Sequence, residues 1–312
     1  MALKPRIGLA LGSGSSRGWA HIGVIKMLVE NGIEPDVIAG SSIGALVGAS
    51  YATGKLDQLE AWVRSLTRLD VIRFFELNTS LNGFVNKERL HQFLNRYVCA
   101  DDCLIQNLPK QFAAVSTDLA SGDEIWLTQG GLIEAVWSSI SLPGLFPAIR
   151  NDKRWLVDGG LVNPVPISTC RAMGADVVIA VNLNGDIAGK HFRRTPTKDE
   201  AVATKPATGS GGWMDAIGRT VREYSDALLM NHKAGRDSPP GLFDAIAGSI
   251  NITQDRITHY RLAADPPDIL ITPNLMRIGP LEFHRASEVI AGGEEATRQL
   301  LSQIDSVTKV VK

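Results

Sequence analysis

A serine framed by glycines lies near the start of the chain, in the segment Gly40-Ser41-Ser42-Ile43-Gly44. The spacing G-x-S-x-G is typical of a sharp turn from a strand into a helix that exposes the serine hydroxyl. An apolar run at 35–39 precedes the segment, and small residues suited to a closely packed helix follow it at 45–51. Because a serine hydroxyl in this setting can attack a carbonyl carbon, we predict that Ser42 is the nucleophile of an acyl hydrolase.

A second turn with glycines, from Gly12 to Gly18, comes directly after an apolar run at 7–11. Acyl transfer develops negative charge on a carbonyl oxygen, and backbone N–H groups stabilise that charge. A glycine-containing turn that opens a helix supplies such donors. The sequence therefore predicts an oxyanion-binding turn followed by a helix over 18–30.

An aspartate, Asp158, follows the apolar run 155–157 and precedes Gly159 and Gly160. Ligands of open α/β sheets bind beyond the carboxyl ends of the strands, which is where this aspartate is expected. We predict that it accepts the proton of the nucleophile. The alternative is a turn aspartate that caps its own backbone, which is common before glycine.

The elements that must position these residues are strands alternating with helices. Strands are predicted at 7–11, 37–39, 155–157, 177–181 and 268–272, a hairpin at 112–117 and 124–128, and helices at 18–30, 43–51 and 281–304. Such alternation favours a mostly parallel sheet covered by helices on both faces, and the hairpin adds an antiparallel portion. The predicted fold class is α/β with three layers.

The composition excludes several classes of protein. The 312 residues carry 32 basic and 33 acidic side chains, a net charge of −1, so nothing attracts nucleic acid over long range. Three cysteines are too few for a disulfide framework, and we expect free thiols. No secretion signal or apolar stretch long enough to span a membrane is evident. We expect a cytoplasmic protein, with transient contact at the inner face of a membrane.

One segment departs from the globular pattern. Residues 185–212 are rich in Lys, Arg, Pro, Gly and Ser and poor in apolar side chains, so we expect a flexible basic insertion, either a lid or a linker. The domain prediction is a core at 1–184, this insertion at 185–212, and a segment at 213–312 that completes the same domain. The run 56–77 has apolar residues at helical spacing, which fits a core helix with a packed turn or an apolar cap over a lipid-binding groove.

Four motifs occur in one order along the chain: 9–12 leading into Arg17-Gly18 and 21–24, then 40–45, then 141–147, and then 157–160. Together they resemble the patatin-like phospholipase family, in particular its bacterial stand-alone (RssA-type) members. The resemblance extends from about residue 7 to 183 and resumes at 266–273 and the last helix. It implies hydrolysis of lipid acyl esters by a dyad of Ser42 and Asp158, without a cofactor or a metal.

The resemblance also implies an oxyanion hole from the amides of Ser13, Gly14 and Ser15. The residues that support its motifs are Gly12, Arg17, Gly18, Gly40, Gly44, Gly159 and Gly160. The family typically has three or four successive glycines in the first turn, and here serines occupy two of those positions. Because serine adopts φ > 0 less readily than glycine, either the turn keeps its shape at a cost of about 1 kcal/mol or its amides point elsewhere.

Histidine offers an alternative to the dyad. A free aspartate, with a pKa of ~3.9, is a weak base at neutral pH, so the dyad requires burial to raise the pKa of Asp158. The alternative is a triad in the order Ser, Asp, His, for which His284 is the best-placed candidate. His21 lies beside apolar residues and is expected to be structural. Arg17 could bind a phosphate headgroup or orient the turn.

Two other functions compete with hydrolysis. The serines in the first turn are compatible with a weakly catalytic or non-catalytic patatin-like protein that regulates or binds a partner. A dinucleotide-binding enzyme is suggested by the strand 7–11, by Gly12-x-Gly14 and by Asp36. The third glycine of that fingerprint is Arg17 here, which speaks against it.

Overall fold

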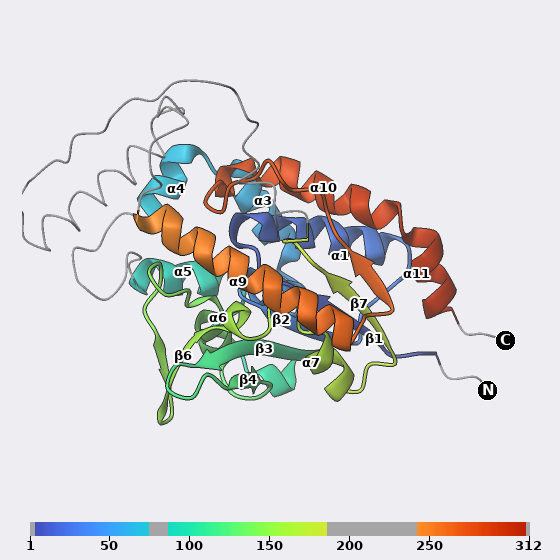
Figure 1. Cartoon of the computed structure of the whole chain (residues 1–312), viewed down its shortest axis with the longest axis horizontal. Coiled ribbons are helices and arrows are strands. Elements are labelled where there is room, and N and C mark those ends of the chain that lie inside the picture. Colours follow the sequence, from blue (N-terminus) through green and yellow to red (C-terminus); the bar gives the residue numbers. More distant parts are fainter. Residues whose placement is uncertain (1–3, 75–86, 186–241, 310–312) are drawn as a thin grey trace, which may run out of the picture.

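The computed structural model describes residues 4–74, 87–185 and 242–309 (Figure 1). The strands are β1 (Ile7–Leu11), β2 (Val37–Ser41), β3 (Gln111–Asp118), β4 (Glu124–Leu127), β5 (Ile149–Asn151), β6 (Arg154–Asp158), β7 (Val177–Val181) and β8 (Ile269–Ile271). The α-helices are α1 (Ala20–Glu30), α2 (Ile43–Ala52), α3 (Leu56–Ser65), α4 (Arg68–Phe74), α5 (Lys87–Tyr97), α6 (Leu132–Ile140), α7 (Ile167–Ala172), α9 (Leu242–Ala264), α10 (Ala286–Arg298) and α11 (Leu301–Thr308). Short 3₁₀ helices are η1 (Ser15–Trp19), η2 (Ile105–Asn107), η3 (Gly159–Leu161) and η4 (Phe283–Arg285).

The strands form one sheet in the order β5-β6-β3-β2-β1-β7-β8, with β4 also paired to β3. The pairs β1–β2, β1–β7, β2–β3 and β7–β8 are parallel. The pairs β3–β4, β3–β6 and β5–β6 are antiparallel. The prediction of a mostly parallel sheet with an antiparallel hairpin is therefore confirmed. Because β8 pairs with β7, a strand from beyond residue 241 completes the sheet.

Side chains of the central strands alternate between two cores, as the two-residue period of a strand requires. Leu9 and Leu11 enter the larger apolar core, which also holds side chains of α1, α2, α3 and α10. Ala10, Ala39 and Ala180 face a smaller core with α7, against which α9 also packs. Small residues on this second face let α7 approach the sheet closely. Helices thus cover both faces. Figure 1 shows α1 and α10 side by side, with α9 below them in the foreground.

The edge of β3 determines where two strand ends meet. β4 pairs along residues 114–117 of β3. Since a strand has only two edges, β2 at 111–115 and β6 at 116–118 share the opposite edge. β2 runs parallel to β3 and β6 runs antiparallel, so the carboxyl ends of β2 and β6 point toward each other. Ser41 is opposite Val115 and Asp158 is opposite the next residue, Ser116.

Most predicted strands differ from the structure by one or two residues at their ends, and two predicted helices differ in kind. The helix predicted at 281–304 is instead η4, α10 and α11, interrupted at Gln299 and Leu300. Apolar periodicity continues across the break, which is why the sequence pattern reads as one helix. The predicted helix 18–30 begins as the 3₁₀ turn η1 and becomes α-helical at Ala20. Apart from Gly185, the predicted insertion at 185–212 lies outside the described residues.

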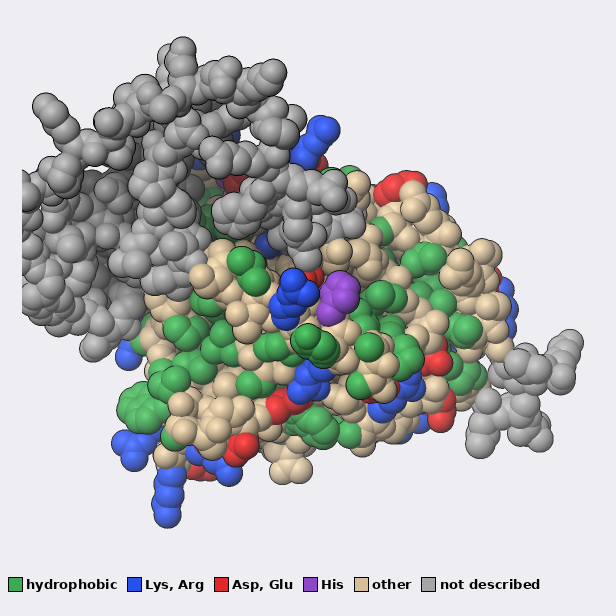
Figure 2. All heavy atoms as spheres, viewed as in Figure 1, with side chains coloured by type: hydrophobic (Ala, Val, Ile, Leu, Met, Phe, Trp, Pro, Cys, Tyr) green, Lys and Arg blue, Asp and Glu red, His purple; other side chains and the backbone are tan. Residues whose placement is uncertain are grey.

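The surface carries no area of one charge on the face drawn in Figure 2, as far as the described residues extend. Basic and acidic side chains are interspersed with apolar ones there, in keeping with the net charge of −1. Within the described ranges, none of the helices combines the length and the apolar character needed to cross a bilayer.

Candidate active site

Ser42 lies on a strained turn between β2 and α2. Its backbone has φ 56° and ψ −127°, a positive-φ conformation that is costly for a residue with a side chain. Glycines make the turn possible: a Cβ on Gly44 would lie 2.1 Å from the Leu11 carbonyl oxygen, and a Cβ on Gly40 would lie 2.4 Å from the backbone of Ala45. The two glycines therefore let α2 begin very close to the ends of β1 and β2, and Ser42 lies immediately before the first residue of α2.

Helix α6 supports this turn from one side. The Ser42 amide donates to the Ser139 hydroxyl at 3.0 Å, and that hydroxyl donates to the Val115 carbonyl oxygen of β3 at 2.5 Å. Ser139 is fully buried. Its hydroxyl thus ties the strained turn to the strand beside it, a role that the sequence analysis did not assign.

Asp158 meets Ser42 at the strand ends. The Ser42 hydroxyl donates to Asp158 Oδ2 at 2.5 Å, and the Gly160 amide donates to Oδ1 at 2.7 Å. The aspartate therefore caps its own turn with one oxygen and accepts from the serine hydroxyl with the other, so the turn cap considered from the sequence does not prevent contact with Ser42. Its backbone is held by the Thr117 hydroxyl, which donates to its carbonyl oxygen at 2.8 Å, and by its own amide, which donates to the Ser141 carbonyl oxygen at 3.0 Å.

The electrostatic setting of Asp158 is unusual for a carboxyl group. The residue has no exposed surface, and burial raises its pKa to about 7, against the opposing effect of the hydrogen bonds from Ser42 and Gly160. A proton acceptor works best when its pKa lies near the working pH. Burial thus supplies the condition that a Ser–Asp dyad requires.

In the first turn, one of the three backbone amides predicted to bind the oxyanion already donates a hydrogen bond within the protein. The Ser13 amide donates to the Pro164 carbonyl oxygen at 2.8 Å, so this amide, one of the three predicted oxyanion donors, is already bonded. No acceptor among the described residues is recorded for the amides of Gly14 and Ser15. Ser15 adopts φ 53°, so the turn reaches the left-handed region with a serine. Its hydroxyl donates to the Pro280 carbonyl oxygen at 2.5 Å, which helps to offset that strain.

The glycines predicted to support the motifs all lie in crowded positions. For each of them a Cβ would come closer than 3.0 Å to another atom; they are Gly12, Gly18, Gly40, Gly44, Gly159 and Gly160. At Gly159 the nearest atom is the Val115 carbonyl oxygen at 2.1 Å, with Ser41 Oγ at 3.0 Å. The crowding at Gly159 follows from two strand ends meeting on one edge of β3.

His284, His21 and Arg17 lie outside the Ser42–Asp158 pair. His284 Nε2 accepts a hydrogen bond from Arg68 Nε at 3.3 Å, so the structure does not assemble a triad with Asp158. His21 is buried, its Nε2 bonds to the Gly12 carbonyl oxygen at 2.7 Å, and burial lowers its pKa to about 4. Arg17 is also buried, which lowers its pKa to about 10, and its amide donates to the Gly14 carbonyl oxygen at 3.1 Å.

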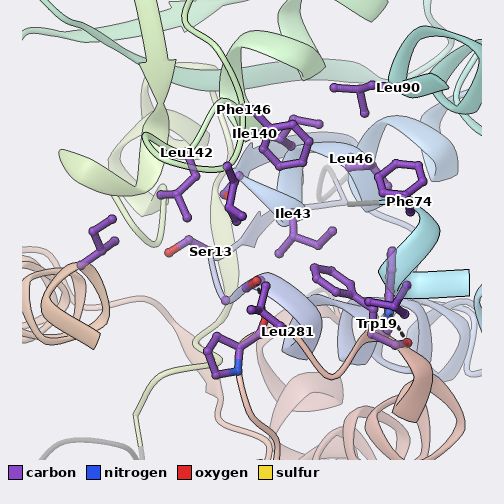
Figure 3. A pocket seen from close by; sticks show the side chains of 18 of the residues that line it. Ser13, Trp19, Ile43, Leu46, Phe74, Leu90, Ile140, Leu142, Phe146 and Leu281 are labelled. Atoms are coloured by element: carbon purple, nitrogen blue, oxygen red, sulfur yellow. Dashed lines mark hydrogen bonds between the residues drawn. The ribbon is translucent and has the colours of Figure 1, made fainter. Parts of the chain in front are cut away.

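An apolar pocket opens beside Ser42, with about 1040 Å³ of space between its lining atoms, part of it open to solvent. The apolar lining consists of Trp19, Ile43, Leu46, Trp62, Leu66, Val71, Phe74, Leu90, Phe93, Ile140, Leu142, Leu145, Phe146, Ile250, Pro280, Leu281 and Phe283. The polar side chains are those of Ser13, Ser15, Ser42, Asn251 and Gln254. Figure 3 shows the pocket from Ser13 at one end to Phe74 and Leu90 at the other, with Ile43 and Leu46 between them.

Two predicted segments contribute to this pocket. The described part of the run 56–77 supplies buried core residues such as Leu59 and also pocket-lining residues such as Trp62 and Phe74. It belongs both to the core and to the pocket wall, and the binding of lipid there stays a prediction. The loop 141–147 supplies Leu142 and Phe146. Residues that the sequence analysis missed are Ser139 and Gln254. Gln254 comes from α9 and had no signal in the sequence, because nothing local marks a glutamine that accepts a hydrogen bond from Ser13, 241 positions away.

Comparisons with known proteins found similar chains. The family model described as patatin-like phospholipase matches residues 9–171. An uncharacterized NTE family protein of Mycobacterium tuberculosis is 33% identical over 335 residues, which cover 96% of this chain and 92% of that protein. A protein of Emericella nidulans named lysophospholipase is 27% identical, covering 96% of this chain and 18% of its own length. The solved structure of VipD from Legionella pneumophila covers 96% of this chain and 67% of that one, with a TM-score of 0.42 at 12% identity.

The fold and the site define an α/β protein with a serine on a strand-to-helix turn beside a buried aspartate. The family model covers more than half of the chain, and the mycobacterial relative matches almost all of it. The chain belongs to the patatin-like phospholipase family.

Proposed function

We propose that the protein is a serine acyl hydrolase that cleaves carboxylic ester bonds of lipids, with Ser42 as nucleophile and Asp158 as proton acceptor. The observation that carries the proposal is the 2.5 Å hydrogen bond from Ser42 Oγ to Asp158 Oδ2 beside an apolar pocket. Family membership supports a lipid substrate, as does the name lysophospholipase of the fungal relative.

The first half of the reaction forms an acyl-enzyme. Ionised Asp158 takes the proton of Ser42 while Ser42 Oγ attacks the ester carbonyl carbon. The negative charge that develops on the carbonyl oxygen is stabilised by the amides of Gly14 and Ser15, which donate to no acceptor within the described part of the chain. The tetrahedral intermediate then collapses, the C–O bond to the alcohol breaks, and Asp158 returns its proton to the departing alkoxide.

The second half releases the acid. Water attacks the acyl carbon while Asp158 takes a proton from it, and the bond to Ser42 Oγ breaks as the serine regains its proton. The pocket accepts the acyl chain, since most of the side chains that line it are apolar. Transient contact with a lipid surface is part of the proposal, because a long-chain substrate resides there.

Labelling and hydrolysis together test the proposal. A fluorophosphonate probe is expected to label wild type and to leave Ser42→Ala unlabelled, and wild type is expected to hydrolyse p-nitrophenyl esters at least ~10³-fold faster than Ser42→Ala. Ser41→Ala is the matched control, because Ser41 is the neighbouring serine and its hydroxyl has no recorded partner among the described residues. A folded wild type that neither labels nor hydrolyses acyl esters would favour the alternative of a binding or regulatory protein.

A further inference from the structure

Helix α9 brings a glutamine to the first turn from far away in the chain. The Ser13 hydroxyl donates to Gln254 Oε1 at 3.2 Å, across 241 positions of sequence. Both residues are buried, with 2% and 4% of their surfaces exposed. Both also line the pocket. A hydroxyl left unpaired in this buried position would be costly, so the hydrogen bond restrains both side chains.

The Gln254 amide group also lies close to Asp158. A Cβ placed on Gly160 would be 2.5 Å from Gln254 Nε2, 2.9 Å from Asp158 Oδ1 and 3.0 Å from Ser13 Cβ. The glutamine, the carboxylate and the first turn therefore all lie around Gly160, which has no side chain. Gln254 thus contacts Ser13 and lies near Asp158.

Two ion pairs hold helix α9 in place near its carboxyl end. Arg261 forms an ion pair with Glu124 of β4 at 2.7 Å. Arg171 of α7 forms one with Asp265, just beyond the end of α9, at 2.9 Å. A glutamine on a helix that is tied to the sheet and to α7 can hold a turn in one orientation.

The orientation of the first turn depends on Ser13. Its amide is bonded to Pro164 and its carbonyl oxygen accepts from Asn184 Nδ2 at 3.4 Å, so the hydroxyl bond to Gln254 is the third restraint on this residue. The next two residues, Gly14 and Ser15, carry the free amides. A rotation of the backbone at Ser13 would redirect both of them.

We propose that Gln254 is a positioning residue, which holds Ser13 and thereby aims the amides of Gly14 and Ser15 at the developing oxyanion. The inference rests on the proposed acyl hydrolase function. Gln254 acts through Ser13 and does not take part in the chemical step. Because the oxyanion is present in the transition states and the tetrahedral intermediate but not in the bound ester, loss of the restraint affects kcat and leaves KM nearly unchanged.

Four variants test this role on a soluble p-nitrophenyl ester. Gln254→Met keeps the volume and removes the hydrogen bond, and Ser13→Ala keeps the Cβ and removes the hydroxyl. Each is expected to lower kcat by ~10- to 100-fold, the cost of misplacing a reacting group by a fraction of an ångström to an ångström, with KM within about twofold. The double variant is expected to be no slower than the slower single variant, because both changes break one bond. Thr253→Ala, an exposed neighbour on α9, is the control with unchanged kinetics.

The outcomes separate the inference from the function on which it rests. Equal rates for wild type and Ser42→Ala overturn both. If hydrolysis depends on Ser42 but Gln254→Met keeps the wild-type kcat, the positioning role alone is wrong. It is also wrong if the losses of the two single variants multiply in the double variant, or if Gln254→Met changes KM alone, which would make Gln254 a contact to bound substrate. Far-UV circular dichroism and thermal melts check that every variant is folded.

Discussion

Asp158→Asn is expected to abolish hydrolysis and to stabilise the protein at neutral pH. The carboxyl group has no exposed surface, and burial raises its pKa from the usual 3.8 to about 7. In the unfolded chain this group ionises at its ordinary pKa, whereas in the folded chain it keeps its proton until the pH approaches 7. Between these values the folded state therefore binds more protons than the unfolded state.

The sign and size of the effect follow from proton linkage. Because the folded state binds the extra proton, the contribution of Asp158 to the free energy of unfolding falls as the pH rises from about 4 to about 7 and is then constant. The difference between 3.8 and about 7 corresponds to about 4 kcal/mol, since one pKa unit is worth ~1.4 kcal/mol. Asparagine has one side-chain oxygen, which can accept from the Gly160 amide, and its NH2 group then faces Ser42 Oγ as a donor. This changed pairing removes ~1 kcal/mol of the gain. A net stabilisation of about 3 kcal/mol above pH 7 remains.

Thermal unfolding of wild type and Asp158→Asn at several pH values measures this difference. The melting temperatures are expected to be similar near pH 4 and to diverge until about pH 7, where the variant melts roughly 5–10 °C higher. Asp305→Asn is a matched control, because Asp305 is a half-exposed aspartate on α11. Parallel curves for wild type and Asp158→Asn, or a variant that melts lower at pH 8, would refute the reasoning about a buried carboxyl group.

Three further predictions follow from the same structure. The kcat/KM of wild type on a neutral ester is expected to rise up to about pH 7, because Asp158 must be ionised to accept a proton; a limb near pH 4 would contradict this. Gly44→Ala is expected to lower the free energy of unfolding by at least ~1–3 kcal/mol, since a Cβ there would lie 2.1 Å from the Leu11 carbonyl oxygen. Gly248→Ala, which has open space in α9, is expected to be neutral or to stabilise by ~0.5–1 kcal/mol; chemical denaturation compares the two. Trp62→Ala opens the apolar lining and is expected to shift kcat/KM toward longer acyl chains by up to ~4-fold per methylene, or ~0.8 kcal/mol each; an unchanged chain-length profile would place the chain elsewhere.

Local patterns were sufficient to predict most elements of the sheet. The apolar runs at 7–11 and 177–181 are strands with those bounds, and the hairpin at 112–117 and 124–128 appears as β3 and β4. The motif residues Ser42 and Asp158 could be selected because their flanking glycines mark sharp turns at strand ends. The split of the last predicted helix into α10 and α11 could not be foreseen, because apolar spacing continues through Leu300.

The amino-acid sequence alone determined which side chains are available for chemistry and which turns carry them. Only the tertiary structure decided that β2 and β6 share one edge of β3, which brings Ser42 to Asp158 across 116 positions of the chain. It also decided that Asp158 is fully buried and that Gln254 reaches Ser13. The physical reason is that strand register, loss of solvent and contacts between distant segments arise from packing the whole chain. No short stretch of residues contains that information.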